Sequence, residues 1–283
     1  MNVGKRSRVN SLLFHALSML LGFFMIYPLL WTLASSFKDN STIFTNAYSL
    51  IPEQWGIIDN YVSGWNGIGG VPFGTFILNS FIVASIGTVG GVVCSLMAAY
   101  AFARVKFRLS GFWFMCVMIT LMIPNQVMIV PQYILFKKLH LIDTLTALIM
   151  PWFFGSAFFI FLMVQFIRGL PIDLDEAAKI DGCSKFGVFY RITIPLVSPA
   201  IVTSTIFSFY WIWQDFFQPL IFMSDTTKFT VSLALNLFLD PNSYSNYGGM
   251  FAMSVVSLIP VILVFLFFQK YLVEGIATSG IKG

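Results

Sequence analysis

The sequence predicts an all-α membrane protein with about six transmembrane helices. Of its 283 residues, 58% are hydrophobic and only 10% are charged, whereas soluble domains carry roughly 25% charged and 45–50% apolar residues. Six apolar runs reach the length of about 20 residues that a spanning helix needs: 12–34, 73–102, 111–130, 145–167, 196–222 and 250–269. Because the runs are continuous rather than alternating, helices are favoured over a membrane barrel.

The first three runs carry further local signals. The first follows a basic start and is too long for the apolar core of a signal peptide, so we interpret it as a retained span. The second contains Gly87 and Gly91 in GxxxG spacing, which lets a neighbouring helix approach closely. Pro124 and Pro131 flank the outer end of the third run, where we expect the helix to end or kink.

The distribution of Lys and Arg predicts the orientation, because cytoplasmic connections carry an excess of both. With the N-terminus inside, twelve of these residues lie in cytoplasmic segments and four in outer segments. We therefore expect 1–10 to be a cytoplasmic N-terminus, 11–270 the membrane domain and 271–283 a cytoplasmic tail. The outer connection 35–72 either folds over the outer face, where an external partner would meet it, or stays loosely ordered. A short interfacial helix is expected from Tyr133 to Leu141.

A polar stretch at residues 170–195, hereafter the hairpin, interrupts the apolar sequence and holds four of the chain's twelve carboxylates. Asp173 and Glu176 have the spacing of a capping box, and a helix from Leu174 to Asp181 is therefore expected. Gly182 is well placed to end this helix, because a left-handed residue commonly follows the last helical turn. The charge count places the hairpin in the cytoplasm.

The second half of the hairpin predicts another short helix. Ser184 is expected to cap it, Tyr190 to lie at its end, and Pro195 to mark the return to the membrane. The small residues Ala177 and Ala178 would let another protein approach the first helix closely. Three charged residues would lie at the rim of that contact: Glu176, Lys179 and Asp181. From these residues alone, two interpretations stay open, a partner docked on the hairpin and a helix docked on its own bundle.

The fifth run contains a second candidate site, the segment from Trp211 to Pro219, with Trp213, Gln214 and Asp215 as its candidate path residues. Asp215 is the only carboxylate deep in a predicted span, and an ionisable residue there usually faces a cavity or a partner. Tryptophan and glutamine are residue types that bind sugars, through the ring face and through amide hydrogen bonds. The alternative is structural, with Asp215 hydrogen-bonded within the bundle and Pro219 kinking the helix.

Several functions are disfavoured by missing motifs. The sequence has no GxxxxGK[ST] phosphate loop, no HExxH and no GxSxG, and its two histidines lie far apart in the chain. Its three cysteines lack the spacing of a zinc site, so we expect no metal site. Basic residues are scattered among short loops, so a nucleic-acid partner is not expected. The chain is therefore predicted not to be an enzyme.

The hairpin resembles the EAA motif of permease subunits of bacterial ATP-binding-cassette importers. The matching residues are Glu176-Ala177-Ala178, Gly182 and Ile192-Thr193-Ile194-Pro195, with Ile before the proline and Cys183 where a small Ala is usual. Further segments resemble the MalG-type half of the maltose/oligosaccharide permease family: Asn79-Ser80, Met122-Ile123-Pro124, Pro131-Gln132-Tyr133, Leu139 to Thr144, Asp181-Gly182 and Ala277 to Gly283. His140 departs from the family's usual Gly.

The resemblance implies a type I ABC importer permease fold in the bacterial inner membrane, and half of a pathway for a sugar or oligosaccharide. Its partners would be a second homologous permease, two ABC ATPases that bind ATP and Mg²⁺, and an extracytoplasmic solute-binding protein, with lipid around the spans and no cofactor in this chain. The implied ATPase-coupling residues are Glu176, Ala177, Ala178, Lys179, Asp181 and Gly182. The candidate path residues are Asn79, Trp213, Gln214 and Asp215.

A self-contained secondary transporter or channel for a small polar solute is the alternative. Such a protein would show paired intramembrane ionisable residues or an internal repeat. The sequence shows one such acid and no repeat, which disfavours this alternative.

Overall fold

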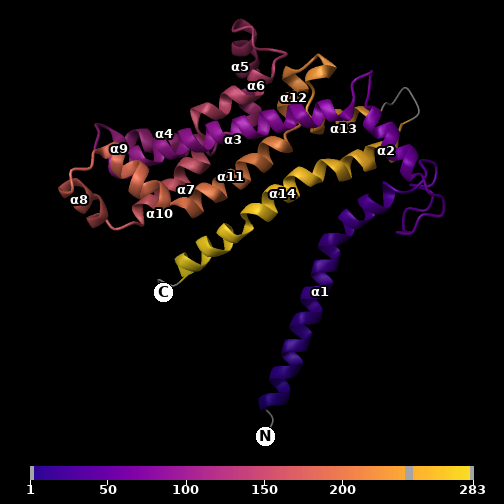
Figure 1. Ribbon diagram of the computed structural model, residues 1–283, viewed down its shortest axis with the longest axis horizontal. Coiled ribbons are helices and arrows are strands. Elements are labelled where there is room, and N and C mark those ends of the chain that lie inside the picture. Colours follow the sequence, from indigo (N-terminus) through magenta and orange to yellow (C-terminus); the bar gives the residue numbers. More distant parts are fainter. Residues whose placement is uncertain (1–2, 240–244, 281–283) are drawn as a thin grey trace. The chain divides into compact units, whose positions relative to one another are not determined.

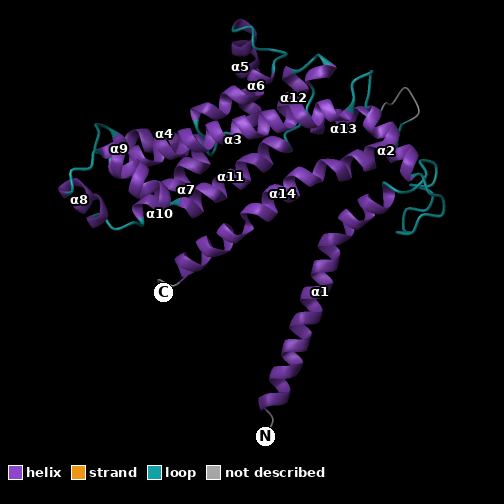
Figure 2. Cartoon of the chain, viewed as in Figure 1, coloured by secondary structure: helices purple, strands orange, loops and turns teal. Residues whose placement is uncertain are grey.

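The structure is a computed structural model that describes residues 3–239 and 245–280, with side chains from 11 to 239 and from 245 to 270. The described chain is helical, with two isolated β-bridges and no strand (Figure 2). Figure 1 labels its helices and colours them along the sequence. The chain divides into two compact units. Unit 1 comprises Met1–Phe73 and Leu235–Leu258, and unit 2 comprises Gly74–Ala234 and Ile259–Gly283.

The α-helices are α1 (Val3–Ser35), α2 (Ile57–Asn66), α3 (Phe73–Arg104), α4 (Ser110–Thr120), α5 (Asn125–Lys138), α6 (Leu145–Ile149), α7 (Ala157–Arg168), α8 (Asp173–Ile180), α9 (Lys185–Val188), α10 (Ile194–Leu196), α11 (Ser198–Trp213), α12 (Phe217–Phe222), α13 (Val231–Leu237) and α14 (Tyr247–Gly280). Two 3₁₀ turns, η1 (Met150–Phe154) and η3 (Thr226–Lys228), and one π-helical turn, η2 (Phe189–Thr193), complete the described elements.

The spans agree with the predicted number. Four described segments are long and apolar enough to cross a membrane: Ser11–Ser35, Phe73–Arg104, Leu145–Arg168 and Tyr247–Lys270. Two bent helix pairs raise the number to six when each pair is counted as one span: Ser110–Thr120 with Asn125–Lys138, and Lys185–Leu196 with Ser198–Trp213. About six transmembrane helices were expected, and the composition and length of these helices bear that out.

The third expected run, 111–130, is not one straight helix. It is divided between α4 and α5, which meet at an angle of 100°. Pro124 precedes α5 with extended backbone, so the proline ends the run as expected. Pro131 lies inside α5 and does not end it. Of the short helix expected from Tyr133 to Leu141, only residues 133–138 are helical, as the last part of α5, and the chain from Leu139 to Leu141 lies beyond its end.

The core of unit 2 lies where α3, α7 and α11 pack together. Its buried residues come from all three helices: Val92, Leu96, Ala99, Ile160, Met163, Val164, Ile167 and Ala200. The glycines of α3 face the 3₁₀ turn η1, which lies within the segment Leu145–Arg168, and Gly87 also faces α11. A side chain at Gly87 would come closest to Ile212 of α11, one at Gly87 or Gly91 would contact Trp152, and one at Gly90 would overlap the ring of Phe153. The close approach predicted from the glycine spacing is therefore made by η1 and, at Gly87, by α11.

The connection 35–72 of unit 1 is ordered, so the loosely ordered alternative is wrong, while its place on the outer face stays a prediction. Ile43, Lys38 and Asn60 are buried there. The Asn60 side-chain amide donates to the carbonyl oxygens of Ser36 and Lys38 at 2.9 and 2.7 Å. The Lys38 ammonium donates to the carbonyl of Asn46 at 3.0 Å. These bonds satisfy buried polar groups, and they tie α2 to the chain that follows α1.

Candidate functional site

The first helix of the hairpin, α8, begins one residue before the predicted start. Its N-cap is Ile172, and no side chain caps it, so the predicted capping box is wrong. Asp173 lies instead in the first turn with Asp175 and Glu176. Carboxylates in this turn are stabilised by the positive end of the helix dipole. The capping pattern therefore located the helix correctly but misplaced its first residue.

The end of α8 matches the prediction for Gly182. This residue has a φ of 80°. Its amide donates to the carbonyl of Lys179 at 3.0 Å, and the Cys183 amide donates to the carbonyl of Ala178 at 2.9 Å. The two bonds form a Schellman motif, in which glycine adopts the left-handed conformation without a steric penalty. The expected cap of the next helix is also confirmed, because the Ser184 hydroxyl accepts from the Gly187 amide at 3.1 Å.

The second helix of the hairpin is longer than expected. It continues from α9 through the π-helical turn η2 to Leu196 instead of ending at Tyr190. In the turn, the Ile194 amide donates to the carbonyl of Phe189, five residues earlier. The widened turn precedes Pro195, which lacks an amide donor and would clash in a regular helix interior. The chain bends by 74° between Leu196 and Ser198, so the change of direction follows Pro195. The return to the membrane at Pro195 stays a prediction.

The helix α8 has an inward and an outward face. Asp175 and Ala178, three residues apart, are buried on the inward face. The other predicted coupling residues are exposed: Glu176, Ala177, Lys179, Asp181 and Gly182. Two large apolar side chains that the sequence interpretation did not include are also exposed, Ile180 at 86% and Phe186 at 73%. Of the small pair, only Ala177 is open to a partner.

Three contacts hold the hairpin to the end of α3. Arg104 Nε lies 3.3 Å from Asp175 Oδ2, and both side chains are nearly buried, with 7% and 10% exposed. Arg104 Nη2 donates to the carbonyl of Leu170 at 2.8 Å, and the Tyr100 hydroxyl donates to the carbonyl of Lys185 at 3.1 Å. We call these contacts the anchor. Sequence reasoning missed the anchor, because Arg104 and Asp175 are each of a common type at their places in the chain.

The fifth expected run is interrupted at its second candidate site. The helix α11 ends at Trp213, and α12 begins at Phe217. Asp215 lies in the break, where its Oδ1 accepts from the amides of Phe217 and Gln218 at 3.1 and 3.4 Å. Gln214 and Asp215 line a cavity of about 400 Å³. The acid therefore makes the expected local hydrogen bonds and also faces a cavity.

Trp213 does not line that cavity. Its ring is buried and stacks on Phe209 at 5.7 Å between centroids, and its carbonyl accepts from the Ser232 hydroxyl at 2.9 Å. The tryptophans in the lining are Trp211, two residues earlier on another face of α11, and Trp152 of η1. Trp211 lies in the segment singled out from the sequence, but Trp213 was chosen as the path residue, because two tryptophans two residues apart do not reveal which one faces inward. Trp152 was missed altogether.

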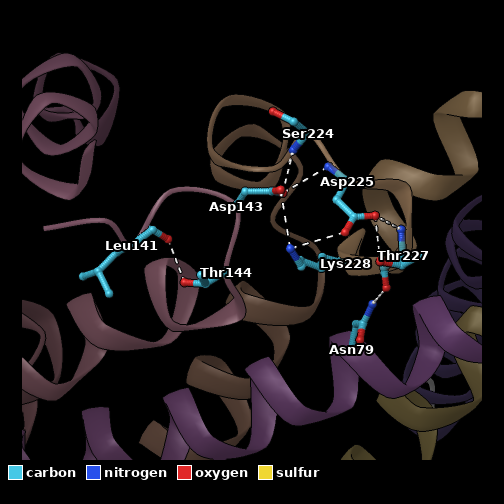
Figure 3. Close-up of polar contacts among 8 residues, drawn as sticks. All are labelled: Asn79, Leu141, Asp143, Thr144, Ser224, Asp225, Thr227 and Lys228. Carbon is cyan, nitrogen blue, oxygen red and sulfur yellow. Dashed lines mark hydrogen bonds and ion pairs between the residues drawn. The ribbon is translucent and has the colours of Figure 1, made fainter. Parts of the chain in front are cut away.

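Asn79 belongs to a second polar group (Figure 3) and is not among the residues that line the cavity. Its amide donates to the carbonyl oxygens of Thr227 and Phe229 at 2.9 and 3.0 Å. The neighbouring Ser80 hydroxyl accepts from the Val231 amide at 2.8 Å. Asn79 therefore positions the chain that leads into α13, and its predicted role in the path stays a prediction.

Asp143 organises the same region. Its Oδ1 accepts from the amides of Ser224 and Asp225, both at 3.0 Å (Figure 3). These backbone hydrogen bonds hold the pKa of the Asp143 carboxyl below its usual value, with Lys228 adding to the effect. Lys228 Nζ lies 3.5 Å from Asp143 Oδ2 and 3.3 Å from Asp225 Oδ2. His140 and Asp143 both have positive φ, 56° and 62°. The positive φ of His140 is a backbone conformation that glycine would adopt there without strain.

The depressed pKa of Asp143 predicts an acid-dependent stability. Its contribution is complete above the unfolded-state pKa of about 3.9 and is lost as the pH falls through the folded-state pKa. In Asp143→Asn, the side-chain oxygen still accepts hydrogen bonds but no longer titrates. We expect the free energy of unfolding of the wild type to exceed that of this variant by about 1 kcal/mol at pH 7. The difference should vanish once the pH has fallen below both the unfolded-state and the folded-state pKa of Asp143. Thermal unfolding of both proteins at each pH measures the difference, and a constant difference would contradict the prediction.

With this geometry in place, residues 91–278 match the family described as the inner membrane component of binding-protein-dependent transport systems. The chain belongs to this family. The permease is 38% identical over 259 residues to the probable ABC transporter permease protein YurM of Bacillus subtilis, covering 91% of this chain and 84% of the relative. It is 35% identical over 266 residues to the arabinooligosaccharides transport system permease protein AraQ of the same species, covering 94% and 93%.

A solved structure also resembles the permease. It is a bacterial ABC transporter involved in the import of the acidic polysaccharide alginate, with a TM-score of 0.80 at 21% identity. The match covers 94% of the permease and 97% of that chain, and it confirms the predicted importer-permease fold. The permease is thus a multi-pass membrane component of a transport system. The secondary transporter or channel is not favoured.

Proposed function

We propose that the permease forms half of the translocation pathway of an ATP-driven sugar or oligosaccharide importer in the bacterial inner membrane. A second, homologous permease forms the other half, and an external solute-binding protein delivers the cargo. The family description and the name of the relative AraQ support the class of system and of cargo. The excess of Lys and Arg supports cytoplasmic termini and a cytoplasmic hairpin.

The division of α8 into two faces carries the proposal. Asp175 and Ala178 hold the helix to its own bundle, while Glu176, Ala177 and Lys179 stay open to a partner. That partner is a cytoplasmic ABC ATPase, two copies of which bind ATP and Mg²⁺. When ATP closes the ATPase pair, the hairpin moves with its ATPase. The anchor carries this displacement to α3, and the permease pair changes its access from one side of the membrane to the other.

Glu176→Lys tests the docking role. Glu176 is exposed and makes no ion pair within the described residues, so the change breaks no side-chain contact of α8 and costs only the dipole stabilisation of its first turn, about 0.3–1 kcal/mol. We expect ATP-driven uptake to fall at least about tenfold, because like charges meet where the wild type has opposite ones. Uptake by the transporter reconstituted in liposomes measures the effect, and co-purification of the ATPase shows its cause.

Glu176→Gln is the matched control, since it keeps the size of the side chain and introduces no repulsion; we expect a smaller loss. Unchanged uptake in Glu176→Lys would remove the docking role from this residue. A further arm reconstitutes the permease pair without ATPases. Uptake driven by an ion gradient in that arm would favour a secondary transporter and overturn the proposed function.

A further inference from the structure

Polar and aromatic side chains converge where two helix pairs of unit 2 are broken. One break separates α4 from α5, and the other separates α11 from α12. Two cavities of about 400 and 550 Å³ adjoin there, because they share four lining residues: Asn125, Trp152, Trp211 and Gln218. We call them together the polar cavity. Their size lies within the range of small-molecule sites, about 300–1,000 Å³.

Five amide side chains in this lining have no internal partner among the described residues: Asn125, Gln126, Gln132, Gln214 and Gln218. None of them makes a side-chain hydrogen bond within the described residues. An unpaired amide facing lipid is costly, and broken helices at membrane depth occur where they line a cavity or are buried in protein. Each amide offers two donors and an acceptor, the combination that complements a hydroxyl group.

Aromatic walls complete the lining. Trp211 stacks on Phe159 with 5.2 Å between centroids and 18° between the ring planes, which fixes its orientation. Trp152 is held against α3, since a side chain at Gly87 or Gly91 would contact it. Rigid tryptophan rings present broad apolar faces, and the C–H faces of a sugar ring pack against such surfaces. Amides and tryptophans together thus match a ligand with both hydroxyl groups and apolar ring faces.

The charged residues of the lining further restrict the chemical class of the ligand. Among the described residues, Asp215 is the only acid in the lining, and no Lys, Arg or His lines either cavity. Asp215 Oδ1 is engaged by two amides, whereas Oδ2 has no hydrogen bond within the described part of the chain and remains an acceptor. An acid without a cation beside it repels an anionic ligand and accepts from hydroxyl groups.

From these observations we propose that the polar cavity is a carbohydrate subsite in this half of the transporter, selective for neutral over acidic sugars. The inference rests on the proposed function and adds the site and the charge class of the cargo. The lining amides bind hydroxyl groups, the two tryptophans pack against ring faces, and Asp215 excludes uronic acids. This selectivity differs from that expected for the transport of the acidic polysaccharide alginate.

The first test reads occupancy directly. In the complete reconstituted transporter, Cys94, Cys116 and Cys183 are replaced by Ala, and Gln214→Cys is labelled with a hydrophilic thiol reagent. A neutral trisaccharide, chosen as one that the wild type transports from a panel including arabinotriose, should slow labelling about tenfold near saturation. A uronic acid trisaccharide should not, unless Asp215→Asn is also present. Leu220→Cys, on α12 but outside the lining, is the control and should be unaffected by sugar.

The second test uses Gln214→Leu in the wild-type background, which removes the hydrogen-bonding group but keeps the volume. Uptake of the neutral trisaccharide should fall about fivefold, while ATP hydrolysis stimulated by the binding protein persists. Gln165→Leu is the matched control, an exposed glutamine of α7 outside the cavity. A wild type that transports no sugar would overturn the proposed function. Transport without protection of the thiol in the Gln214→Cys variant would overturn the subsite, and equal protection by the acidic sugar would overturn the selectivity.

Discussion

Arg104→Met is expected to lower the free energy of unfolding by about 3–5 kcal/mol, because it leaves the Asp175 carboxylate buried without its cation. It also removes the hydrogen bond to the carbonyl of Leu170, at the start of the hairpin. Thermal unfolding of the purified permease complex measures the stability. At temperatures where the variant stays folded, ATP hydrolysis should continue while uptake is lost, because the hairpin no longer moves α3.

Two further variants separate charge from position. Asp175→Leu combined with Arg104→Met should be more stable than Arg104→Met alone, since no buried charge is then unpaired. Arg104→Lys keeps the positive charge. The planar guanidinium of Arg104 places one nitrogen near Asp175 and another on the Leu170 carbonyl, whereas the lysine ammonium has a single nitrogen. This variant should therefore keep more stability than Arg104→Met and still lower the amount of sugar imported per ATP. If all three variants transport as wild type does, the anchor has no part in coupling.

Gly67→Ala is expected to destabilise unit 1 by roughly 3 kcal/mol. Gly67 ends α2 with a φ of 75° and a ψ of −148°, a conformation that side chains other than glycine rarely adopt. An added Cβ would also overlap the backbone carbonyl oxygen of Val71, which cannot rotate away as a side chain would. The turn between Ile68 and Val71 would have to open. Hydrogen exchange of the Ile68 and Val71 amides, together with thermal unfolding, measures the loss.

Gly69→Ala provides the matched control two residues later. Gly69 also has positive φ, 61°, but a Cβ there meets nothing within 4 Å. Gly69→Ala should therefore lower the free energy of unfolding only through the strain of a left-handed backbone, by about 1–2 kcal/mol. If the two variants unfold alike, the steric contribution assigned to Val71 is absent.

Sequence reasoning succeeded where the signal is local. Gly182 predicts where α8 ends, and Ser184 predicts where α9 begins. Both roles depend on hydrogen bonds between residues at most five apart. The spans follow from composition, which needs no knowledge of contacts. The extra helical turn up to Leu196 was missed because Pro195 normally ends a helix, and only the preceding π-helical turn accommodates it.

Long-range contacts were beyond a single sequence. Arg104 and Asp175 are distant in the chain, and each is unremarkable in its own segment, a basic residue ending a span and an acid in a first helical turn. The polar cavity was found only in part, through Gln214 and Asp215. Its other walls come from the break before α5 and from η1. The pattern of apolar residues along a sequence does not predict that these distant segments lie together.

The two faces of α8 have a consequence for the pairing of subunits. The inward residues Asp175 and Ala178 hold the helix in place, while the exposed residues such as Glu176, Lys179 and Ile180 contribute little to the fold of the chain itself. Substitutions on the outward face can therefore accumulate without unfolding the permease. Under the proposed docking, recognition of one ATPase rather than another is separable from folding, so a permease in which only these surface residues are exchanged should co-purify with a different ATPase.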